Sequence, residues 1–340
     1  METLATTPGL YPLPDWAKDE LSDLKGHQKE DMVSGDDGEA VAAVYAEVRE
    51  ELVAVQREAG LDRVVEGQPR WDDVLTHPLA VHDAVETRGL LRYYDNNNFY
   101  REPAVTGPLT ADGDLAAELT AFADRTTADE RQVVLPGPYT LSRLATDEYY
   151  GGETALLEGV ADFLAGELAD VPAFETLLLL EPSLAVDPPG DGLDERASEG
   201  VDRVARAVDA ETVVQPYWDA VGERLHAHLL DTDVDALGYD FVSAPEDNRY
   251  LINEYGTRET ALLGVVDGGN TVSEGADGVA ERVDWVRSNT PGADLRRVYA
   301  SANTPLFHLP HSTFESKLRA LTGGRDRLPA GAESAREADA

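Results

Sequence analysis

Short apolar and β-branched runs alternate along the chain with longer segments whose apolar residues recur at helical spacing. The short runs predict nine candidate strands: Leu4–Thr7, Arg63–Glu66, Leu90–Asp95, Gln132–Pro136, Thr176–Leu180, Thr212–Pro216, Ala236–Val242, Ala261–Asp267 and Arg297–Ser301. The longer segments predict helices over Ala40–Ala59, Trp71–Thr87, Leu115–Arg125, Gly152–Ala169, Leu193–Val208, Ala220–Leu229, Val272–Ser288 and Thr313–Leu321. This alternation is typical of a parallel sheet with crossover helices.

The alternation predicts an α/β fold, and we expect a (β/α)8 TIM barrel with long βα loops. No Gly-rich dinucleotide fingerprint follows the first predicted strand, and no Pro/Ser-rich linker divides the chain. Nine candidate strands are one too many for an eight-stranded barrel, so one is auxiliary, and the pattern does not say which. We expect one barrel domain over residues 1–322 and a disordered, acidic tail over residues 323–340. Two polar stretches, Leu21–Glu39 and Ala185–Gly200, predict long loops that are either active-site covers or mobile surface.

Polar residues follow the predicted strands at the point where each strand ends. The C-terminal ends of parallel barrel strands meet on one face, and the chemistry of such barrels collects there. Glu181 follows the apolar run Thr176–Leu180, and Asp240 lies inside an otherwise apolar strand. A buried lone carboxylate costs roughly several kcal/mol unless it is paired, so each acid should face a partner. We expect these two acids to be the catalytic residues, as general acid or base or as groups that hold an amino group.

Metal-binding residues are scarce. The sequence contains no Cys, which excludes disulfides, thiolate nucleophiles and every zinc site that needs Cys. His226 and His228 are two residues apart on a predicted helix, so they point in different directions and cannot chelate one ion together. His308 and His311 flank a Pro and could approach each other, but no third ligand lies near them in sequence. We therefore expect no metal site.

The charge balance is strongly acidic, with 66 Asp and Glu against 28 Lys and Arg and a formal net charge of −38. The acids are spread along the chain, which favours a solvated surface over a binding site. Salt screens such self-repulsion, so the composition indicates a halophilic, acidic proteome. Nucleic acid is not expected as a partner, because the positive charge that neutralises phosphates is missing.

No apolar run is long enough to span a membrane, and Met1–Gly9 lacks the basic-then-apolar pattern of a signal peptide. We therefore expect a cytoplasmic protein with no membrane partner.

Several motifs, taken together, resemble those of the cobalamin-independent methionine synthases, which are methyltetrahydropteroyltriglutamate–homocysteine methyltransferases. Their barrels belong with that of uroporphyrinogen decarboxylase. The similar stretches include Thr6–Trp16, Gly67–Asp73, Tyr94–Pro103, Gly264–Asn270 and Asn303–Pro310, with "LPGPYTLSRLA" and "LLEPSL" between them. The resemblance runs from about Thr6 to Leu321, and it is closest to the N-terminal, zinc-free type of barrel in this family.

The resemblance implies transfer of a methyl group from methyl-tetrahydrofolate to homocysteine, whose sulfur a zinc ion holds as thiolate. This chain departs from the family at the zinc ligands. Where the catalytic barrels have His-x-Cys, this sequence has Pro216 and Trp218, and Thr304 stands at the second Cys. Only Asp240 keeps a carboxylate, at the position of the family's Glu. We therefore expect this chain to bind no cofactor by itself, with zinc present only if a partner chain supplies it.

Two further positions point to loss of homocysteine binding. Leu180 replaces the Asp of the family's D-E-P motif, and Gln68 replaces the Glu of its G-E motif. The strand ends and the resemblance together give these candidate substrate-binding residues: Gly9, Tyr11, Gln68, Arg70, Asp95, Asn96, Asn97, Asn98, Tyr217, Trp218, Asp219, Asn303 and His308. Tyr and Trp can stack on a planar ring, whereas an Asn run can also be an ordinary turn.

Two functions stay open at this point. In the first, the chain acts in methionine biosynthesis with a separate, zinc-bearing methionine synthase barrel, and it supplies an interface or a face that binds methyltetrahydrofolate or another methyl donor. In the second, it transfers a methyl or other one-carbon group to another acceptor without zinc. A decarboxylase or corrinoid-methyltransferase relative is a weaker third reading. Whether the chain is an enzyme by itself is not decided by its sequence.

Overall fold

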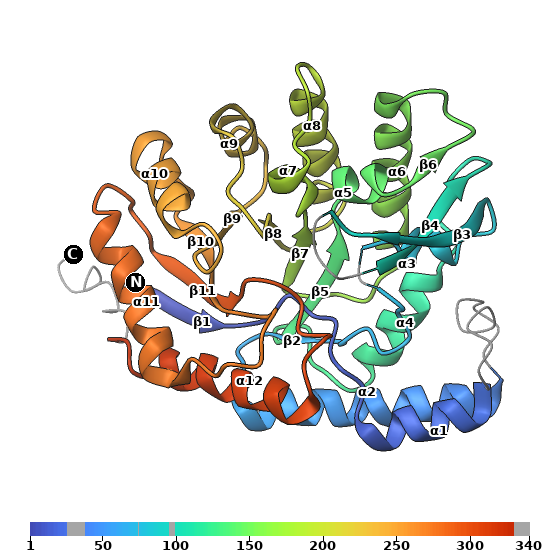
Figure 1. Cartoon of the computed structure of the whole chain (residues 1–340), viewed down its shortest axis with the longest axis horizontal. Helices are drawn as coiled ribbons and strands as arrows, with labels where there is room; N and C mark the ends of the chain where they lie inside the picture. The colour runs from blue at the N-terminus through green and yellow to red at the C-terminus, as the bar shows by residue number, and fades with distance from the viewer. Residues whose placement is uncertain (26–37, 74, 95–98, 330–340) are drawn as a thin grey trace, which may run out of the picture.

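The computed structural model describes residues 1–25, 38–73, 75–94 and 99–329 (Figure 1). An eight-stranded parallel sheet forms its centre, in the order β1-β11-β10-β9-β8-β7-β5-β2. The strands are β1 (Glu2–Ala5), β2 (Val64–Val65), β5 (Arg131–Pro136), β7 (Thr176–Leu180), β8 (Glu211–Gln215), β9 (Ala236–Asp240), β10 (Thr260–Val266) and β11 (Arg297–Ala302). The predicted α/β barrel fold is confirmed.

The two edges of this sheet approach each other and close the barrel. The carbonyl oxygen of Ala5, at the end of β1, accepts hydrogen bonds from the N–H groups of Asp62 and Arg63, at 3.0 and 3.4 Å. These two residues lead directly into β2, and the Asp62 carboxylate accepts the Ala5 N–H in return at 2.7 Å. Strands such as β7, with the sequence TLLLL, are buried at every position because both faces are covered.

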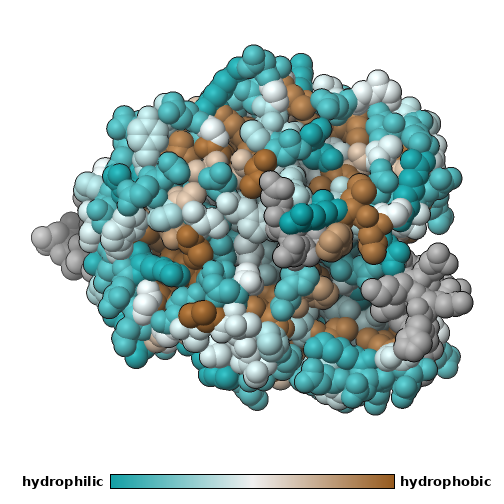
Figure 2. Space-filling view, in the orientation of Figure 1, coloured by the Kyte–Doolittle hydropathy of each residue, from teal (hydrophilic) through white to brown (hydrophobic). Residues whose placement is uncertain are grey.

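Helices surround the sheet (Figure 1). They are α1 (Asp15–Lys25), α2 (Glu39–Ala59), α3 (His77–Ala80), α4 (Asp114–Ala123), α5 (Pro138–Arg143), α6 (Glu153–Leu168), α7 (Ser183–Val186), α8 (Leu193–Ala205), α9 (Glu223–Leu230), α10 (Pro245–Tyr255), α11 (Gly275–Asn289) and α12 (His311–Arg325). Hydrophilic residues cover most of the outer rim, and hydrophobic ones show mainly in recesses (Figure 2). Within the described residues, no helix combines the length and the apolar composition needed to cross a membrane.

A second, three-stranded sheet lies beside the barrel. It consists of the antiparallel hairpin β3 (Val85–Arg92) and β4 (Phe99–Val105), with β6 (Thr146–Asp147) parallel to β4. Of the candidate strand Leu90–Asp95, Leu90–Arg92 belong to this hairpin and Asp95 lies outside the described residues, so this candidate is the auxiliary one. Tyr93 and Tyr94 therefore follow a hairpin strand and not a barrel strand.

The predicted helix over Trp71–Thr87 is wrong. Among the described residues of this stretch, only those of α3 are helical, and the chain is already extended from Val85. The Asp73 carboxylate accepts the N–H groups of Leu75 and Thr76, both at 2.8 Å. This local turn competes with helical hydrogen bonds for the same donors.

Other boundaries also differ from expectation. The polar stretch Ala185–Gly200 contains the end of α7 and the first half of α8. Residues 26–37 of the predicted loop Leu21–Glu39 lie outside the described residues, and α1 occupies the part before them. Helix α12 continues to Arg325, so the predicted domain end at residue 322 falls inside a helix. A Cβ on Gly324 of this helix would collide with Val279 of α11, so the glycine allows the two helices to pack closely. Residues 330–340 of the predicted tail lie outside the described residues.

Candidate functional site

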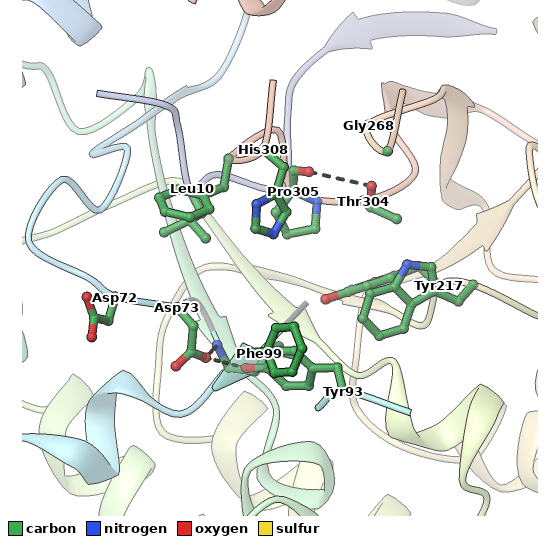
Figure 3. A pocket seen from close by; sticks show the side chains of 14 residues that line it. Leu10, Asp72, Asp73, Tyr93, Phe99, Tyr217, Gly268, Thr304, Pro305 and His308 are labelled. Atoms are coloured by element: carbon green, nitrogen blue, oxygen red, sulfur yellow. Dashed lines mark hydrogen bonds between the residues drawn. The ribbon is translucent and has the colours of Figure 1, made fainter. Parts of the chain in front are cut away.

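A cavity of about 190 Å³ opens at the C-terminal face of the barrel (Figure 3). Its walls come from the loops that follow β1, β2, β8, β10 and β11 and from the auxiliary hairpin. The lining residues are Leu10, Asp72, Asp73, Leu75, Tyr93, Phe99, Tyr217, Trp218, Gly268, Gly269, Thr304, Pro305, Phe307 and His308. This is the face on which barrels of this type carry their chemistry.

Asp240 ties together three strand ends below this cavity. Its buried carboxylate accepts N–H groups from Trp218 at 3.0 Å, Val242 at 2.9 Å and Ser243 at 2.8 Å. The side-chain amide of Asn303 donates to both carboxylate oxygens, at 3.2 and 3.1 Å. The sequence predicts a partner for this buried acid, and in the structure that partner is a set of N–H groups. These bonds join the ends of β8, β9 and β11.

The positions that the motif resemblance equates with the family's zinc ligands lie at this same corner. Trp218 contacts Asp240 through its backbone N–H, and Thr304 follows Asn303 directly. A zinc ion needs about four N, S or O ligands. Here the one carboxylate already accepts N–H groups on both oxygens, and Pro216 and Trp218 offer no side-chain ligand. The residues at this corner therefore do not suit zinc.

Backbone strain is concentrated around the cavity. Among the described residues, four that are not glycine have positive φ: Leu10 at 45°, Gln68 at 47°, Tyr94 at 40° and Trp218 at 73°. Each such residue costs about 1–3 kcal/mol and persists only when its surroundings hold it. Gln68 Oε1 accepts the Leu10 N–H at 2.7 Å, and Asp240 holds the Trp218 N–H. Strain of this kind is typical of functional sites.

Glu181 lies at the end of β7 but does not line the cavity. It is fully buried, and its carboxylate accepts the N–H groups of Tyr139 at 2.9 Å and Thr140 at 2.7 Å. A Cβ on Gly137 would collide with this carboxyl group, so only glycine allows the close approach. Burial raises the pKa of Glu181 to about 7. Through these two hydrogen bonds, Glu181 holds the turn that follows β5.

Gly9 and Gln68, two predicted substrate-binding residues, shape the backbone beneath the cavity. Gln68 Nε2 donates to the carbonyl of Val134 at 3.2 Å, while its Oε1 holds Leu10. Gly9 has a φ of 71°, and a Cβ there would lie 2.7 Å from Gln68 Oε1. Together they bind the loop after β1 to the ends of β2 and β5.

Tyr11 and Arg70 point into the protein. The hydroxyl of Tyr11 is buried and donates to Gln56 Oε1 at 3.1 Å. Arg70 Nη1 lies 2.6 Å from Glu118 Oε1 and 3.4 Å from Asp114 Oδ1. Both residues contribute to the frame and not to the cavity surface.

Of the predicted substrate-binding residues, Tyr217, Trp218 and His308 line the cavity. Asn303 lies just beneath it, and Asp219 is exposed. Asp95, Asn96, Asn97 and Asn98 lie outside the described residues.

Sequence reasoning missed the aromatic residues that flank the Asn run. Tyr93 and Phe99 line the cavity from the hairpin, and the Tyr93 hydroxyl donates to the Asp73 carboxylate. Burial raises the pKa of both groups. The sequence shows that these aromatic residues cluster beside a polar run, but it does not show that the hairpin reaches the cavity.

The described lining includes acids and aromatic rings but no Lys or Arg. The hydroxyl of Tyr217 points into the cavity (Figure 3), and it has no hydrogen-bond partner within the described part of the chain. Burial raises the pKa of Tyr217 well above its usual value and lowers that of His308. At neutral pH both side chains are therefore uncharged.

One group of potential metal ligands occurs among the described residues, away from the cavity. His77, Asp114 and Glu118 place their ligand atoms within 4.8 Å of one another. Burial lowers the pKa of His77 to about 3 and raises that of Glu118 to about 7. The Arg70 guanidinium lies 3.4 Å from the Asp114 carboxylate and 2.6 Å from that of Glu118, so both carboxylates already have a cationic partner.

Within the described part of the chain, His308 and His311 have different surroundings. His311 Nε2 lies 3.8 Å from Glu51 and 3.6 Å from Glu315, whereas His308 faces the cavity. His226 is buried against the hydroxyl of Tyr239 at 3.0 Å.

The sequence matches the family model described as cobalamin-independent synthase, N-terminal domain, over residues 81–290. It is similar to the methionine synthase of Sulfolobus acidocaldarius, with 23% identity over 278 residues, or 81% of this chain and 78% of that protein. The methionine synthase of Thermoplasma acidophilum is 24% identical over 230 residues, or 64% of this chain and 61% of that protein.

Solved structures with the same fold include a B12-independent methionine synthase from Shewanella sp. W3-18-1 in complex with selenomethionine. It matches with a TM-score of 0.77 at 17% identity, over 96% of both chains. A putative vitamin-B12-independent methionine synthase from Listeria monocytogenes matches with a TM-score of 0.70 at 15% identity, over 96% of this chain and 98% of that one. At these identities the likeness supports the fold alone.

Proposed function

The chain belongs to the cobalamin-independent methionine synthase family, and on this premise we propose that it acts in methionine biosynthesis as a partner to a separate, zinc-bearing barrel. The partner carries the metal and the homocysteine half of the reaction. This chain supplies the methyl-donor-binding face, and its cavity is the place where the donor binds. Methyltetrahydrofolate is the donor that the family resemblance implies.

One observation carries the proposal. N–H groups of Trp218, Val242, Ser243 and Asn303 already engage the carboxylate of Asp240, the residue that the resemblance equates with a zinc ligand of the family. The open, aromatic cavity directly above that corner supports a retained binding role. The acidic composition fits a cytoplasm with high salt, in which we place the protein.

The test mixes the purified chain with a zinc-bearing family member in molar salt. Light scattering after size exclusion measures complex formation, and conversion of homocysteine to methionine measures methyl transfer. We expect a complex and faster transfer. Trp218→Leu should remove the acceleration but keep the complex, whereas the control Tyr149→Leu, at an exposed tyrosine outside the cavity lining, should change neither. If the two chains neither associate nor alter the transfer rate, the proposal fails.

A second candidate is a zinc-independent one-carbon transferase with Glu181 and Asp240 as catalytic residues and another acceptor. The observation that favours it is the pKa of Glu181, raised by burial to about 7, which suits a general acid or base at neutral pH. Neither carboxylate lines the cavity, so this is the weaker reading. Activity of the chain alone, abolished by Glu181→Gln and by Asp240→Asn in variants that circular dichroism shows to be folded, would support it.

A further inference from the structure

The cavity has the surface chemistry of a cation site. Its described lining contains Asp72 and Asp73 and no Lys or Arg, so nothing in it neutralises an anionic ligand. Arg101 is not part of the lining, and its Nε lies 3.0 Å from Asp72 Oδ2. Asp73 faces N–H and O–H donors, from Leu75 and Thr76 as well as Tyr93.

Aromatic rings form the walls, and they stand at steep angles to one another. Trp218 meets Tyr217 at 73° with ring centroids 4.7 Å apart, and Tyr94 at 70° with centroids 5.8 Å apart. Tyr93 meets Trp218 at 52° and 6.5 Å. A corner of tilted rings surrounds a compact, rounded group on several sides. The faces of such rings attract cations.

The polar groups that reach the cavity are compatible with a positive charge. Tyr93 donates its hydroxyl proton to Asp73, which makes its ring richer in electrons. The Tyr217 hydroxyl points inward and has no partner within the described residues, so it is free to accept a hydrogen bond. His308 at the rim is neutral at neutral pH because burial lowers its pKa. None of these groups repels a cation.

The auxiliary hairpin completes the enclosure. Phe99 begins β4 and lines the cavity while remaining 57% exposed. Figure 3 shows Phe99 and Tyr93 together on one side of the cavity, with Tyr217 and His308 lying on other sides. Phe99 and Tyr93 therefore reach the cavity from an element outside the eight-stranded sheet.

From these observations we propose that the cavity binds a methylated onium centre, that is, a positively charged nitrogen or sulfur that bears methyl groups. The proposal rests on the donor-binding role proposed above and names the chemistry of the donor. An attacking thiolate sulfur forms a bond to the methyl carbon while the bond from that carbon to the onium atom breaks. The electron pair of the broken bond stays on the onium atom, which leaves neutral. A small quaternary ammonium or sulfonium compound and an N5-protonated methyl-folate both present this centre.

Calorimetry on the chain alone, at constant molar NaCl, tests the charge requirement. The probes are choline and its uncharged isostere 3,3-dimethylbutan-1-ol. We expect choline to bind roughly tenfold more tightly than the alcohol, as cation–π attraction predicts. Equal affinities, or no binding of choline, would overturn the proposal. 5-Methyltetrahydrofolate is the third probe: its competition with choline assigns the site to a protonated folate, whereas folate binding without choline binding also overturns the proposal.

Variants locate the site. Phe99→Leu should weaken choline binding several-fold and leave the affinity for the alcohol unchanged. Phe99→Trp, which keeps an aromatic ring at this position, should bind choline as the wild type does. Both changes are at an exposed position, so the fold tolerates them. Tyr149→Leu is the matched control, because Tyr149 is 52% exposed and lies outside the cavity lining. If Phe99→Leu leaves choline binding unchanged, the cavity is not the site. The partner chain is absent from these measurements, so they stand or fall independently of complex formation.

Discussion

The Asn303 side-chain amide lies 3.1 Å from Asp240 Oδ2, which joins the end of β11 to the end of β9 across 63 residues of sequence. The same Asn303 accepts the Gly268 N–H on its Oδ1 at 3.0 Å. One amide therefore uses its donor and its acceptor to connect three strand ends beneath the cavity. The sequence suggests that Asp240 is a catalytic group, whereas in the structure its carboxylate holds the strand ends of this face together.

Asp240→Asn should destabilise the fold by about 3 kcal/mol, because an amide NH2 would then face N–H donors that lose their acceptor. Urea denaturation at neutral pH measures this loss. The exposed Asp219→Asn is the control and should change stability by less than about 1 kcal/mol.

The double variant Asp240→Asn with Asn303→Asp separates structure from catalysis. It restores an amide–carboxylate pair with the roles exchanged, so it should recover part of the lost stability. If the double variant is no more stable than Asp240→Asn alone, the pair does not hold the strand ends as described.

Glu181 should make stability depend on pH. Its folded pKa is about 7, against about 4.5 for the free group, so between these values the folded state binds a proton that the unfolded state lacks. The stabilisation is fully present below pH 4.5 and is lost as the pH rises through 7. The expected loss is on the order of 3 kcal/mol.

The measurement compares the unfolding free energy of the wild type with that of Glu181→Gln across this range. Because Glu118 also has a raised pKa, the difference between the two proteins is the quantity to follow. We expect the advantage of the wild type to shrink as the pH rises. The exposed Glu195→Gln should show no such trend, and a flat difference for Glu181→Gln would contradict burial as the cause.

Gly9→Ala should destabilise the protein more than Gly151→Ala. Both glycines have positive φ, at 71° and 79°, so both substitutions carry a similar backbone strain of about 1–2 kcal/mol. Only at Gly9 does the new Cβ meet a neighbour, since Gly151 has open space around it. Thermal unfolding of the two variants isolates the cost of the clash with Gln68. Equal losses would mean that Gln68 moves away freely.

Salt should stabilise the fold. With a net charge of −38, the compact state repels itself, and raising NaCl from about 0.1 to 1 M shortens the screening length from about 10 to 3 Å. We expect the melting temperature to rise steeply at the low end of this range. Sucrose at equal osmolality is the control, because it does not screen charge. A salt response no larger than that of sucrose would argue against charge repulsion.

Helix periodicity predicted most of the elements because it depends on neighbours in sequence. The segments Gly152–Ala169 and Leu193–Val208 became α6 and α8 almost as expected. Helix α10 was missed, although Pro245 at its start and Glu246 and Asp247 in its first turn are the usual signals.

The sequence by itself determined the alternating pattern, and through it the barrel and the family, since periodicity and motifs are local properties. It also placed Tyr217, Trp218 and His308 on the cavity, because each follows a barrel strand. Only the tertiary structure decided that Leu90–Arg92 belongs to a hairpin beside the barrel and that Asp240 is engaged by Asn303. Such pairings depend on which strand ends meet when the sheet closes. The spacing of residues along the chain does not determine which distant residues come together.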